Sequence, residues 1–316
     1  MSWIRTVLGD VDAAALGVCY AHEHLIIDAS YPTQANPDFL LDSVGRCVSE
    51  LREFHAAGGR AMIDSMPCDC GRNVRKLAAA AEQSGVRIVC PTGAHLAKYY
   101  PHGHWSDRYD SETLAGLFIA DIRDGIDAND YSGPIVARTP HRAGVIKIAT
   151  EGVGLTAREQ RLFQAAAEAH RMTGCPILTH VEEGRGGMEQ VEFLCRHGVA
   201  PAHVVLSHTD RAPDGPYHRE LLAAGAYLEY DSAFRWKDGN PTLDLLEALW
   251  PEFGDQLMLG MDAARRRYWH AYGGSPGLTY LLTVFREAMA NRGLDAEVFR
   301  SIFVTNPARA YSFSAT

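Results

Sequence analysis

Short, uniformly apolar runs alternate along the chain with longer segments in which apolar residues recur at helical spacing. The apolar residues of these runs are continuous rather than alternating, which is typical of strands buried on both faces, as in a parallel sheet. The predicted strands cover residues 18–21, 61–64, 86–90, 145–148, 176–179, 203–206, 226–230 and 257–260. Helical patterns between them include residues 74–82 and 158–172, the second preceded by Thr156 as a cap.

A strand followed by a helix, repeated along the whole chain, predicts a (β/α)8 barrel. A doubly wound sheet is the alternative, but no glycine-rich phosphate loop follows the first predicted strand. The length of 316 residues fits one barrel with insertions or two domains of about 150 residues each. Because no linker, low-complexity tract or short repeat interrupts the pattern, we expect one barrel domain over residues 1–316.

Composition bears on which partners and which cellular compartment are expected. Lys and Arg number 30 against 39 Asp and Glu, so the formal net charge is −9 and nucleic acid is not an expected partner. No apolar run reaches the roughly 18 residues of a membrane span, and the N-terminal residues show no secretory signal. Seven scattered cysteines do not form a disulfide framework, so we expect a reduced, cytoplasmic protein. A monomer and a homo-oligomer both stay open.

Polar side chains stand at the ends of several predicted strands. His22 and His24 are two residues apart in extended backbone, so their imidazoles point the same way. The residues that end other strands are Lys147, His180, His208 and Asp262. In a barrel the carboxyl ends of the strands meet at one site. A single such histidine is usually structural, but four histidines with a lysine and an aspartate favour a site for zinc or a similar divalent cation.

The chain resembles the phosphotriesterase family of the amidohydrolase superfamily. The residues that carry the resemblance are 6–9 (TVLG), 16–17 (LG), 22–25 (HEHL), Lys147, 179–180 (TH), 207–208 (SH) and 260–262 (GMD), in order over nearly the whole chain. The resemblance implies a (β/α)8 barrel that holds two divalent metal ions, zinc or alternatively manganese or cobalt. His22, His24 and Asp262 would bind the first ion, and His180 and His208 the second.

Further roles follow from the same resemblance. Lys147 would be carbamylated by carbon dioxide, and its new carboxylate would bridge both ions. A hydroxide between the ions would attack an ester-type carbonyl or a phosphorus centre, and Asp262 would carry its proton to the leaving alkoxide. Glu23 would point away from the metals and have a structural role.

The loops after the strands indicate the substrate. Residues 263–269 (AARRRYW) follow the metal aspartate, and Lys237 and Tyr99 follow other strands. Guanidinium and ammonium groups suit a phosphate dianion. The segment also resembles the branch of the family that opens phosphorylated sugar lactones. We therefore expect Lys237, Arg265, Tyr268 and Tyr99 to bind an anionic small molecule, most simply a phosphorylated sugar 1,4-lactone, while Arg266 and Arg267 are equally well explained as solvated surface.

Several alternatives compete with this assignment. A phosphotriesterase or an N-acyl-homoserine lactone lactonase would use the same metal centre, but an apolar pocket would not need the cations. A non-catalytic ligand-binding barrel, or a metal-free enzyme with Lys147 as a Schiff base, leaves the filled metal positions unexplained. Cys68 and Cys70 lack a second cysteine pair and are expected to pack in a loop. Asp69, or Arg72 with Asn73, are candidates for sugar contacts, and Asp28 is a candidate for orienting a ligand histidine.

Overall fold

A computed structural model describes residues 2–314 and contains the predicted barrel. Its strands are β3 (Cys19–Glu23), β4 (Ala61–Asp64), β5 (Arg87–Val89), β6 (Pro91–Gly93), β7 (Val145–Thr150), β8 (Ile177–Val181), β9 (Val204–Ser207), β10 (Tyr227–Tyr230) and β11 (Leu257–Leu259). All of these pair in parallel, in the orders β3-β4-β5 and β6-β7-β8-β9-β10-β11. The eight predicted strands are confirmed, except that the third is divided into β5 and β6 at Cys90.

The last strand returns to the first. The amides of Met261 and Asp262 both donate to the carbonyl oxygen of His22, at 3.3 and 3.2 Å. The barrel interior is filled by buried apolar side chains, among them Ile63, Val205 and Met258. Because Pro91 has no amide hydrogen, the ladder is interrupted between β5 and β6. A preceding hairpin, β1 (Trp3–Thr6) with β2 (Gly9–Asp12), is antiparallel and was not predicted.

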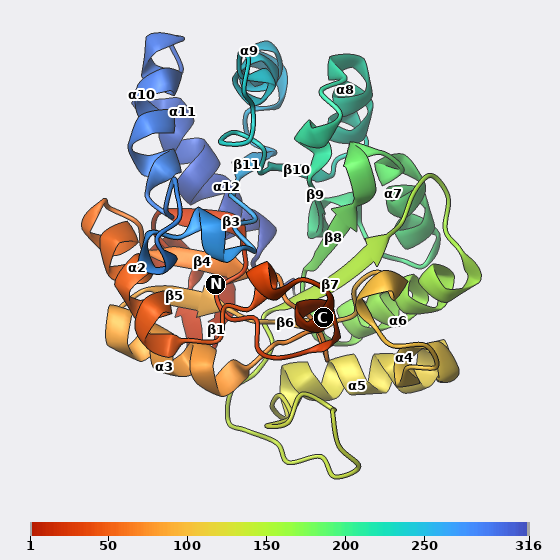
Figure 1. The fold of residues 1–316 in the computed structure, drawn as a ribbon. Coiled ribbons are helices and arrows are strands. Elements are labelled where there is room, and N and C mark those ends of the chain that lie inside the picture. The colour runs from red at the N-terminus through yellow and green to blue at the C-terminus, as the bar shows by residue number, and fades with distance from the viewer. Residues whose placement is uncertain (1, 315–316) are drawn as a thin grey trace.

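Helices surround the barrel, as Figure 1 shows. They are α1 (Tyr31–Ala35), α2 (Val44–Ala56), α3 (Val74–Ser84), α4 (Trp105–Arg108), α5 (Ser111–Arg123), α6 (Ala157–Thr173), α7 (Gly187–Arg196), α8 (Gly215–Ala223), α9 (Pro241–Phe253), α10 (Val284–Asn291), α11 (Ala296–Arg300) and α12 (Asn306–Ala310). Thr156 caps α6 as predicted: its hydroxyl accepts from the Glu159 amide, and the Glu159 carboxylate accepts in return from the Thr156 amide. Within residues 2–314, none of the helices combines the length and the apolar character that crossing a membrane requires.

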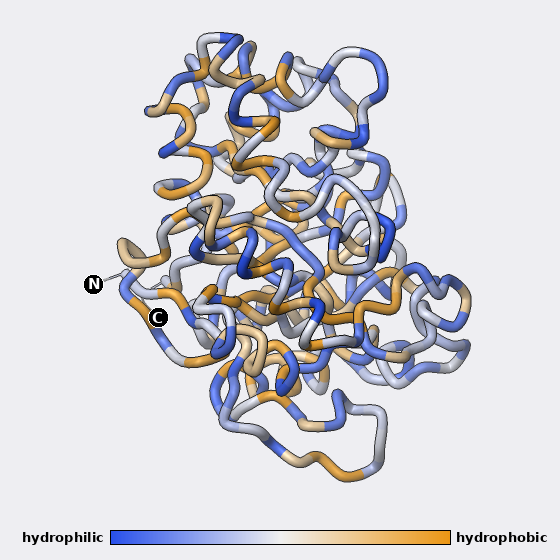
Figure 2. Tube along the Cα trace, turned by 60° about the vertical axis from the view of Figure 1, so that its left-hand side comes forward, coloured by the Kyte–Doolittle hydropathy of each residue, from blue (hydrophilic) through white to orange (hydrophobic). Residues whose placement is uncertain are grey.

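The apolar core has two parts. One fills the barrel, and a larger one separates the strands from the helices. Figure 2 shows apolar stretches running through the middle of the molecule and polar ones at its periphery. The segment between α5 and β7, residues 124–142, extends from the body as a long loop (Figures 1 and 2). Because apolar side chains fill both the barrel and the space between strands and helices, a functional site is expected in the loops that follow the strands.

Candidate metal centre and cavity

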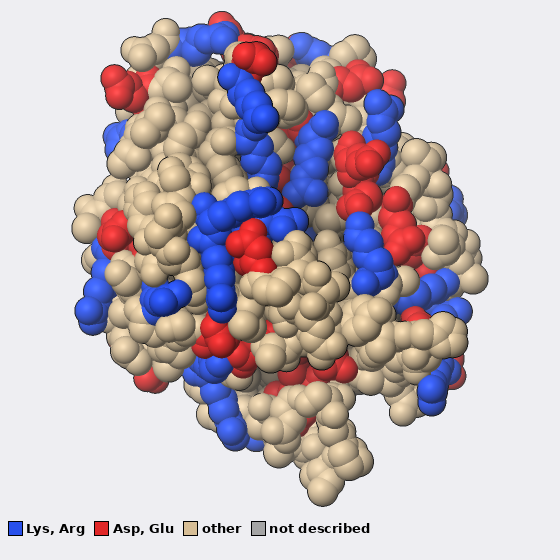
Figure 3. Space-filling model, viewed as in Figure 1, with Lys and Arg blue, Asp and Glu red and all other residues tan. Residues whose placement is uncertain are grey.

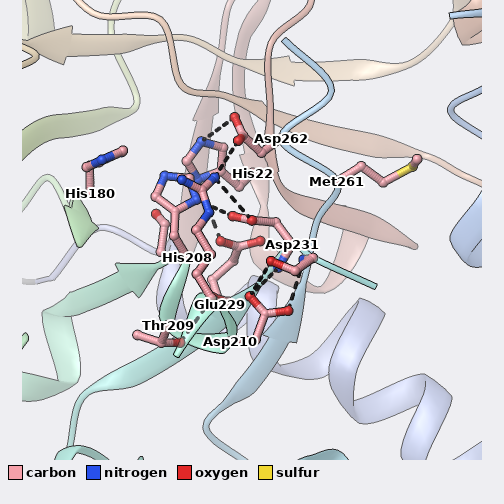
Figure 4. Close-up of polar contacts among 12 residues, drawn as sticks. His22, His180, His208, Thr209, Asp210, Glu229, Asp231, Met261 and Asp262 are labelled. Carbon is pink, nitrogen blue, oxygen red and sulfur yellow. Dashed lines mark hydrogen bonds and ion pairs between the residues drawn. The ribbon is translucent and has the colours of Figure 1, made fainter. Parts of the chain in front are cut away.

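The six predicted ligand residues come together at the carboxyl ends of the strands. His22 lies on β3 and His24 follows it, Lys147 lies on β7, His180 on β8, and His208 and Asp262 follow β9 and β11. Figure 4 shows His22, His208 and Asp262 close together, with His180 to one side. The side chains of the four histidines are no more than 8% exposed, and that of Asp262 is 15% exposed. The convergence expected of a barrel is thus present.

One group of donors surrounds a common point. The Nε2 atoms of His22 and His24 lie 3.7 and 3.1 Å from Oδ1 of Asp262. Metal–ligand bonds of about 2.0–2.2 Å place neighbouring donor atoms roughly 3–3.5 Å apart. These three side chains therefore have the spacing of a divalent cation site.

A second group adjoins it. The rings of His180 and His208 have centroids 4.4 Å apart, and the His208 ring lies 4.7 Å from that of His22. Nε2 of His180 pairs with Glu182, and Nδ1 of His208 pairs with Asp231. A carboxylate behind a histidine fixes the ring and leaves its other nitrogen for a metal. The nitrogens left over here are Nδ1 of His180 and Nε2 of His208.

Lys147 has an unusual environment for a lysine. It is fully buried, and among the described residues the only hydrogen-bond partner of its ammonium group is the Ser207 hydroxyl, 3.5 Å away. Burial lowers the pKa of its ammonium group to about 7. An ordinary buried lysine would have a carboxylate within ion-pair distance, and none of residues 2–314 provides one.

Other buried polar atoms also lack partners. Nδ1 of His22, Nδ1 of His24 and both carboxyl oxygens of Glu229 make no hydrogen bond within residues 2–314. The nearest contact is between Nδ1 of His22 and Glu229, at 3.6 Å. Unpaired buried groups are costly and uncommon in folded proteins. The donor set, with its imidazoles and carboxylates, therefore fits divalent metal ions.

Asp262 is held from several sides. Its backbone has a φ of +47°, a conformation that is uncommon outside glycine. Arg211 donates to its carboxylate at 2.7 Å, and Arg235 donates to its carbonyl oxygen at 2.8 Å. Burial opposes ionisation, but the His24 hydrogen bond together with charges such as Arg211 holds the pKa of Asp262 well below its usual range.

Glu23 has a structural position. Its carboxylate accepts from the amides of Met261 and Ala263, at 2.8 and 3.2 Å, and so fixes the segment that carries Asp262. We expected a structural role for this residue, and the contacts agree with that expectation.

A cavity of about 490 Å³ is lined in part by predicted metal ligands, namely His24, His180, His208 and Asp262. The cavity is lined by three of the four predicted substrate residues, namely Tyr99, Arg265 and Tyr268. The fourth, Lys237, is exposed and does not line the cavity, although its neighbour Trp236 does. Arg267 also lines the cavity. Figure 3 shows that Lys and Arg side chains on the face in view are interspersed with acidic ones rather than forming one basic surface.

The arginines of this loop differ in their partners. Arg265 and Arg267 lie 3.8 and 3.4 Å from the same carboxylate, that of Asp38. Two guanidinium groups on one carboxylate leave one positive charge uncompensated beside the cavity. Arg266 instead pairs with Asp42 at 3.6 Å and is not among the lining residues.

Asp28 does not orient a ligand histidine. Its carboxylate pairs with Lys76 and accepts from Asn73 at 2.7 Å, so that suggestion was wrong. The reason is that the chain turns after β3 and carries Asp28 toward α3 instead of back to the metal residues.

The loop after β4 is also structural. Cys68 and Cys70 are buried free thiols, as expected. Asp69 binds His104, with Nε2 and Oδ2 3.0 Å apart, and Arg72 is fully enclosed by Asp121 and Asp130, at 2.9 and 2.6 Å. Side chains used in this way are not free to bind sugar hydroxyls.

Sequence reasoning missed several residues of the site. Asp231 directly follows β10, so the rule that located the ligands would have located it as well. Glu182 likewise directly follows β8, whereas Arg211 and Arg235 lie four and five residues beyond the ends of β9 and β10. At that distance the course of a loop decides where the side chain points, and no sequence signal marks it.

Comparisons with known proteins agree with this geometry. A profile described as "Phosphotriesterase family" matches residues 2–311. A phospho-furanose lactonase of Mycoplasmopsis synoviae is 30% identical over 322 residues, covering 98% of this chain and 91% of the relative. The crystal structure of an amidohydrolase from Mycoplasma synoviae has a TM-score of 0.94 at 29% identity and covers 99% of this chain and 92% of that one. A lactonase from Listeria monocytogenes has a TM-score of 0.91 at 26% identity, covering 99% and 100%.

Proposed function

Because the chain belongs to the phosphotriesterase family, we propose that this hydrolase is a lactonase that opens a phosphorylated sugar 1,4-lactone. The observation that carries the proposal is the cavity itself. His24, His180, His208 and Asp262 line it, with the buried His22 ring 4.7 Å behind that of His208, and Arg265 and Arg267 add a surplus positive charge to its lining. The relative described as a phospho-furanose lactonase supports the same substrate class.

The six predicted ligand residues would hold two divalent ions, for which zinc is our first choice and manganese or cobalt the alternatives. His22, His24 and Asp262 would bind one ion, and His180 and His208 the other. When bound, such ions lower the pKa of a water molecule between them and polarise the lactone carbonyl. The spacing of the Nε2 and Oδ1 atoms supports this assignment.

Lys147 would join the two sites as a carbamate. The neutral amine adds to carbon dioxide, a nitrogen–carbon bond forms and one proton is released to solvent. The product would be a carboxylate, whose oxygens are ligands that divalent ions accept. Full burial without a carboxylate partner supports the modification, and the lowered pKa of Lys147 supplies the neutral amine. A carbonyl signal from ¹³C-bicarbonate, present in the wild type and absent from Lys147→Met, is the test.

Asp262 would move the proton. Its carboxylate accepts a proton from the attacking water and returns it to the oxygen that leaves when the lactone ring opens. Arg211 holds the carboxylate in place from the side opposite His24. Asp262→Asn is expected to remain folded and to lose turnover, and near-wild-type kcat would remove this role from Asp262.

The wall of the cavity would bind the phosphate. Arg265 and Arg267 supply charge, and the Tyr268 hydroxyl has no protein partner within residues 2–314 and is free to donate. Tyr99 closes the other side of the cavity. Lys237 stays in the proposal as a flexible cation at the rim, because its side chain is exposed and long enough to turn inward.

A panel of substrates tests the function. Metal-loaded protein is assayed on phosphorylated pentono- and hexonolactones, their unphosphorylated counterparts, an N-acyl-homoserine lactone and an aryl phosphotriester. We expect a strong preference for the phosphorylated lactones. Turnover confined to neutral lactones or the triester would keep the metal centre and contradict the phosphate site.

The proposal also covers the cellular compartment and the number of domains. Six of the seven cysteines are buried free thiols and Cys195 is an exposed one, which suits the reducing cytoplasm. We also propose that residues 1–316 form one domain, because the two parallel sheets are joined where the amides of Met261 and Asp262, beyond β11, donate to His22 of β3.

A further inference from the structure

His95 is a buried histidine at the metal end of the cavity that none of the proposed steps uses. It lies two residues beyond the end of β6, is 7% exposed and lines the cavity. Its ring centroid lies 5.2 Å from that of His180 and 4.5 Å from that of Tyr99. The ring therefore stands between a proposed metal ligand and a proposed substrate contact.

Three of the four polar atoms of His95 are engaged. Its amide donates to the Tyr100 hydroxyl oxygen at 2.9 Å, and its carbonyl oxygen accepts from Arg158 at 3.0 Å. Its ring atom Nδ1 accepts from the Leu96 amide at 2.8 Å. The Tyr100 hydroxyl is itself fixed, because it donates to the Cys68 carbonyl oxygen at 3.0 Å. The ring is thus anchored before any ligand arrives.

The Leu96 contact determines the tautomer. A backbone amide only donates, so Nδ1 must offer a lone pair and the proton of the neutral ring resides on Nε2. This arrangement excludes His95 as a third histidine ligand, because coordination through Nε2 would require the proton on Nδ1. Nε2 has no hydrogen-bond partner among residues 2–314, and it is not one of the fully enclosed unpaired atoms. It is an unused donor that the cavity can reach.

We propose that Nε2–H of His95 donates a hydrogen bond to a hydroxyl group on the lactone ring and so selects hydroxylated substrates. The proposal rests on the proposed lactonase function. A neutral donor matches a neutral oxygen, whereas the phosphate has Arg265 and Arg267, and the carbonyl oxygen belongs at the metal ions. A donor left unpaired in a closed site penalises a substrate that lacks the matching acceptor.

The test compares two variants on matched substrates. His95→Phe removes the donor and keeps a flat ring, and His95→Gln restores an N–H at a similar reach. The substrates are the best phosphorylated lactone and its singly deoxygenated analogues. We expect His95→Phe to lower kcat/KM about 10-fold on the parent lactone and to cause no further loss on one deoxy analogue, because that analogue already lacks the acceptor. His95→Gln should recover most of the loss.

Two controls separate this role from a structural one. His102→Phe changes an exposed histidine of the same loop and should leave every kcat/KM unchanged. Metal content and the melting temperature of each variant report folding. If His95→Phe fails to fold, His95→Gln and the wild type still test the proposal on the same substrates. The proposal requires that one deoxy analogue be a distinctly poorer substrate of the wild type than the parent lactone.

Several results would overturn the proposal. One is an equal loss for His95→Phe on the parent and on every deoxy analogue. Another is a ¹⁵N spectrum of histidine-labelled, zinc-loaded protein in which Nδ1 of His95 carries the proton. If the wild type opens no lactone, the proposed function fails and this inference fails with it. If the wild type opens lactones but the two variants do not discriminate the analogues, only the inference on His95 fails.

Discussion

At the scale of single residues, carboxylates behind the histidines decide how the site is arranged. Asp231 pairs with Nδ1 of His208, and Glu182 pairs with Nε2 of His180. Each pairing selects one nitrogen of a ring for the carboxylate and leaves the other for the cavity. The histidines themselves were predictable because they end strands, but the nitrogen that faces the metal was not.

The first prediction concerns Asp231. Asp231→Asn keeps the size of the side chain and weakens its hold on His208, so we expect metal affinity to fall about 10- to 100-fold. Metal content after dialysis against buffers of fixed free zinc is the measurement. Asp244→Asn, in an exposed pair with Arg292, is the matched control and should change nothing. Undiminished zinc affinity in Asp231→Asn would show that His208 needs no such partner.

The second prediction concerns the phosphate. Arg265→Ala should raise KM on a phosphorylated lactone about 10-fold or more, with little change on the unphosphorylated one, since a charge-assisted hydrogen bond is lost. The neighbouring Arg266→Ala is the control, because Arg266 pairs with Asp42 away from the cavity. Steady-state kinetics on the two lactones measures both. An equal rise in KM on the neutral lactone would assign Arg265 to shape rather than to charge.

At the scale of elements, local chemistry and tertiary contacts contribute differently. The start of α6 is encoded locally, in Thr156 and Glu159, and was predicted. The break between β5 and β6 has a local cause, because Pro91 has no amide hydrogen. Its structural effect depends on a tertiary contact, because β6 pairs with β7 from Pro91 onward. The loop over 124–142 depends on distant partners: Arg72, from the loop after β4, holds Asp130, which has a φ of +50°. No local pattern predicts such a contact.

The third prediction tests the α6 cap. Thr156→Ala removes the hydroxyl that accepts from the Glu159 amide, and we expect the free energy of unfolding to fall by about 1 kcal/mol. Urea denaturation measures it, and kcat should be unchanged because the cap lies outside the cavity. Thr156→Ser keeps the hydroxyl and should stay close to the wild type. Equal losses in both variants would point to packing of the threonine methyl group instead.

At the scale of the whole molecule, metal binding and folding are coupled. The predicted ligands at the ends of β3, β7, β8, β9 and β11 are adjacent only in the folded barrel, so we expect metal ions to bind the folded chain in preference to the unfolded one. This coupling makes metal removal a test of the barrel as well as of the site.

The fourth prediction follows from that coupling. Removing metal with a chelator should abolish turnover. It should also lower the melting temperature by roughly 5–10 °C relative to protein in a free zinc concentration about a thousandfold above the Kd for zinc. Calorimetry measures the shift, and we expect one cooperative transition in both states, as one domain requires. Adding zinc back should restore both properties. An unchanged melting temperature and full turnover after chelation would exclude a resident metal centre.

The sequence by itself predicted the order of the barrel strands, and with it that the six predicted ligand residues stand at the strand ends. Apolar runs of strand length and the residues that end them are local features, and a barrel brings all strand ends to one rim. Only the tertiary structure decided which nitrogen of each histidine faces the cavity, that Arg211 and Arg235 hold Asp262, that Asp28 turns toward Lys76, and that His95 has one free N–H. The physical reason is that these contacts join loops distant in sequence, and a loop's course depends on what it packs against.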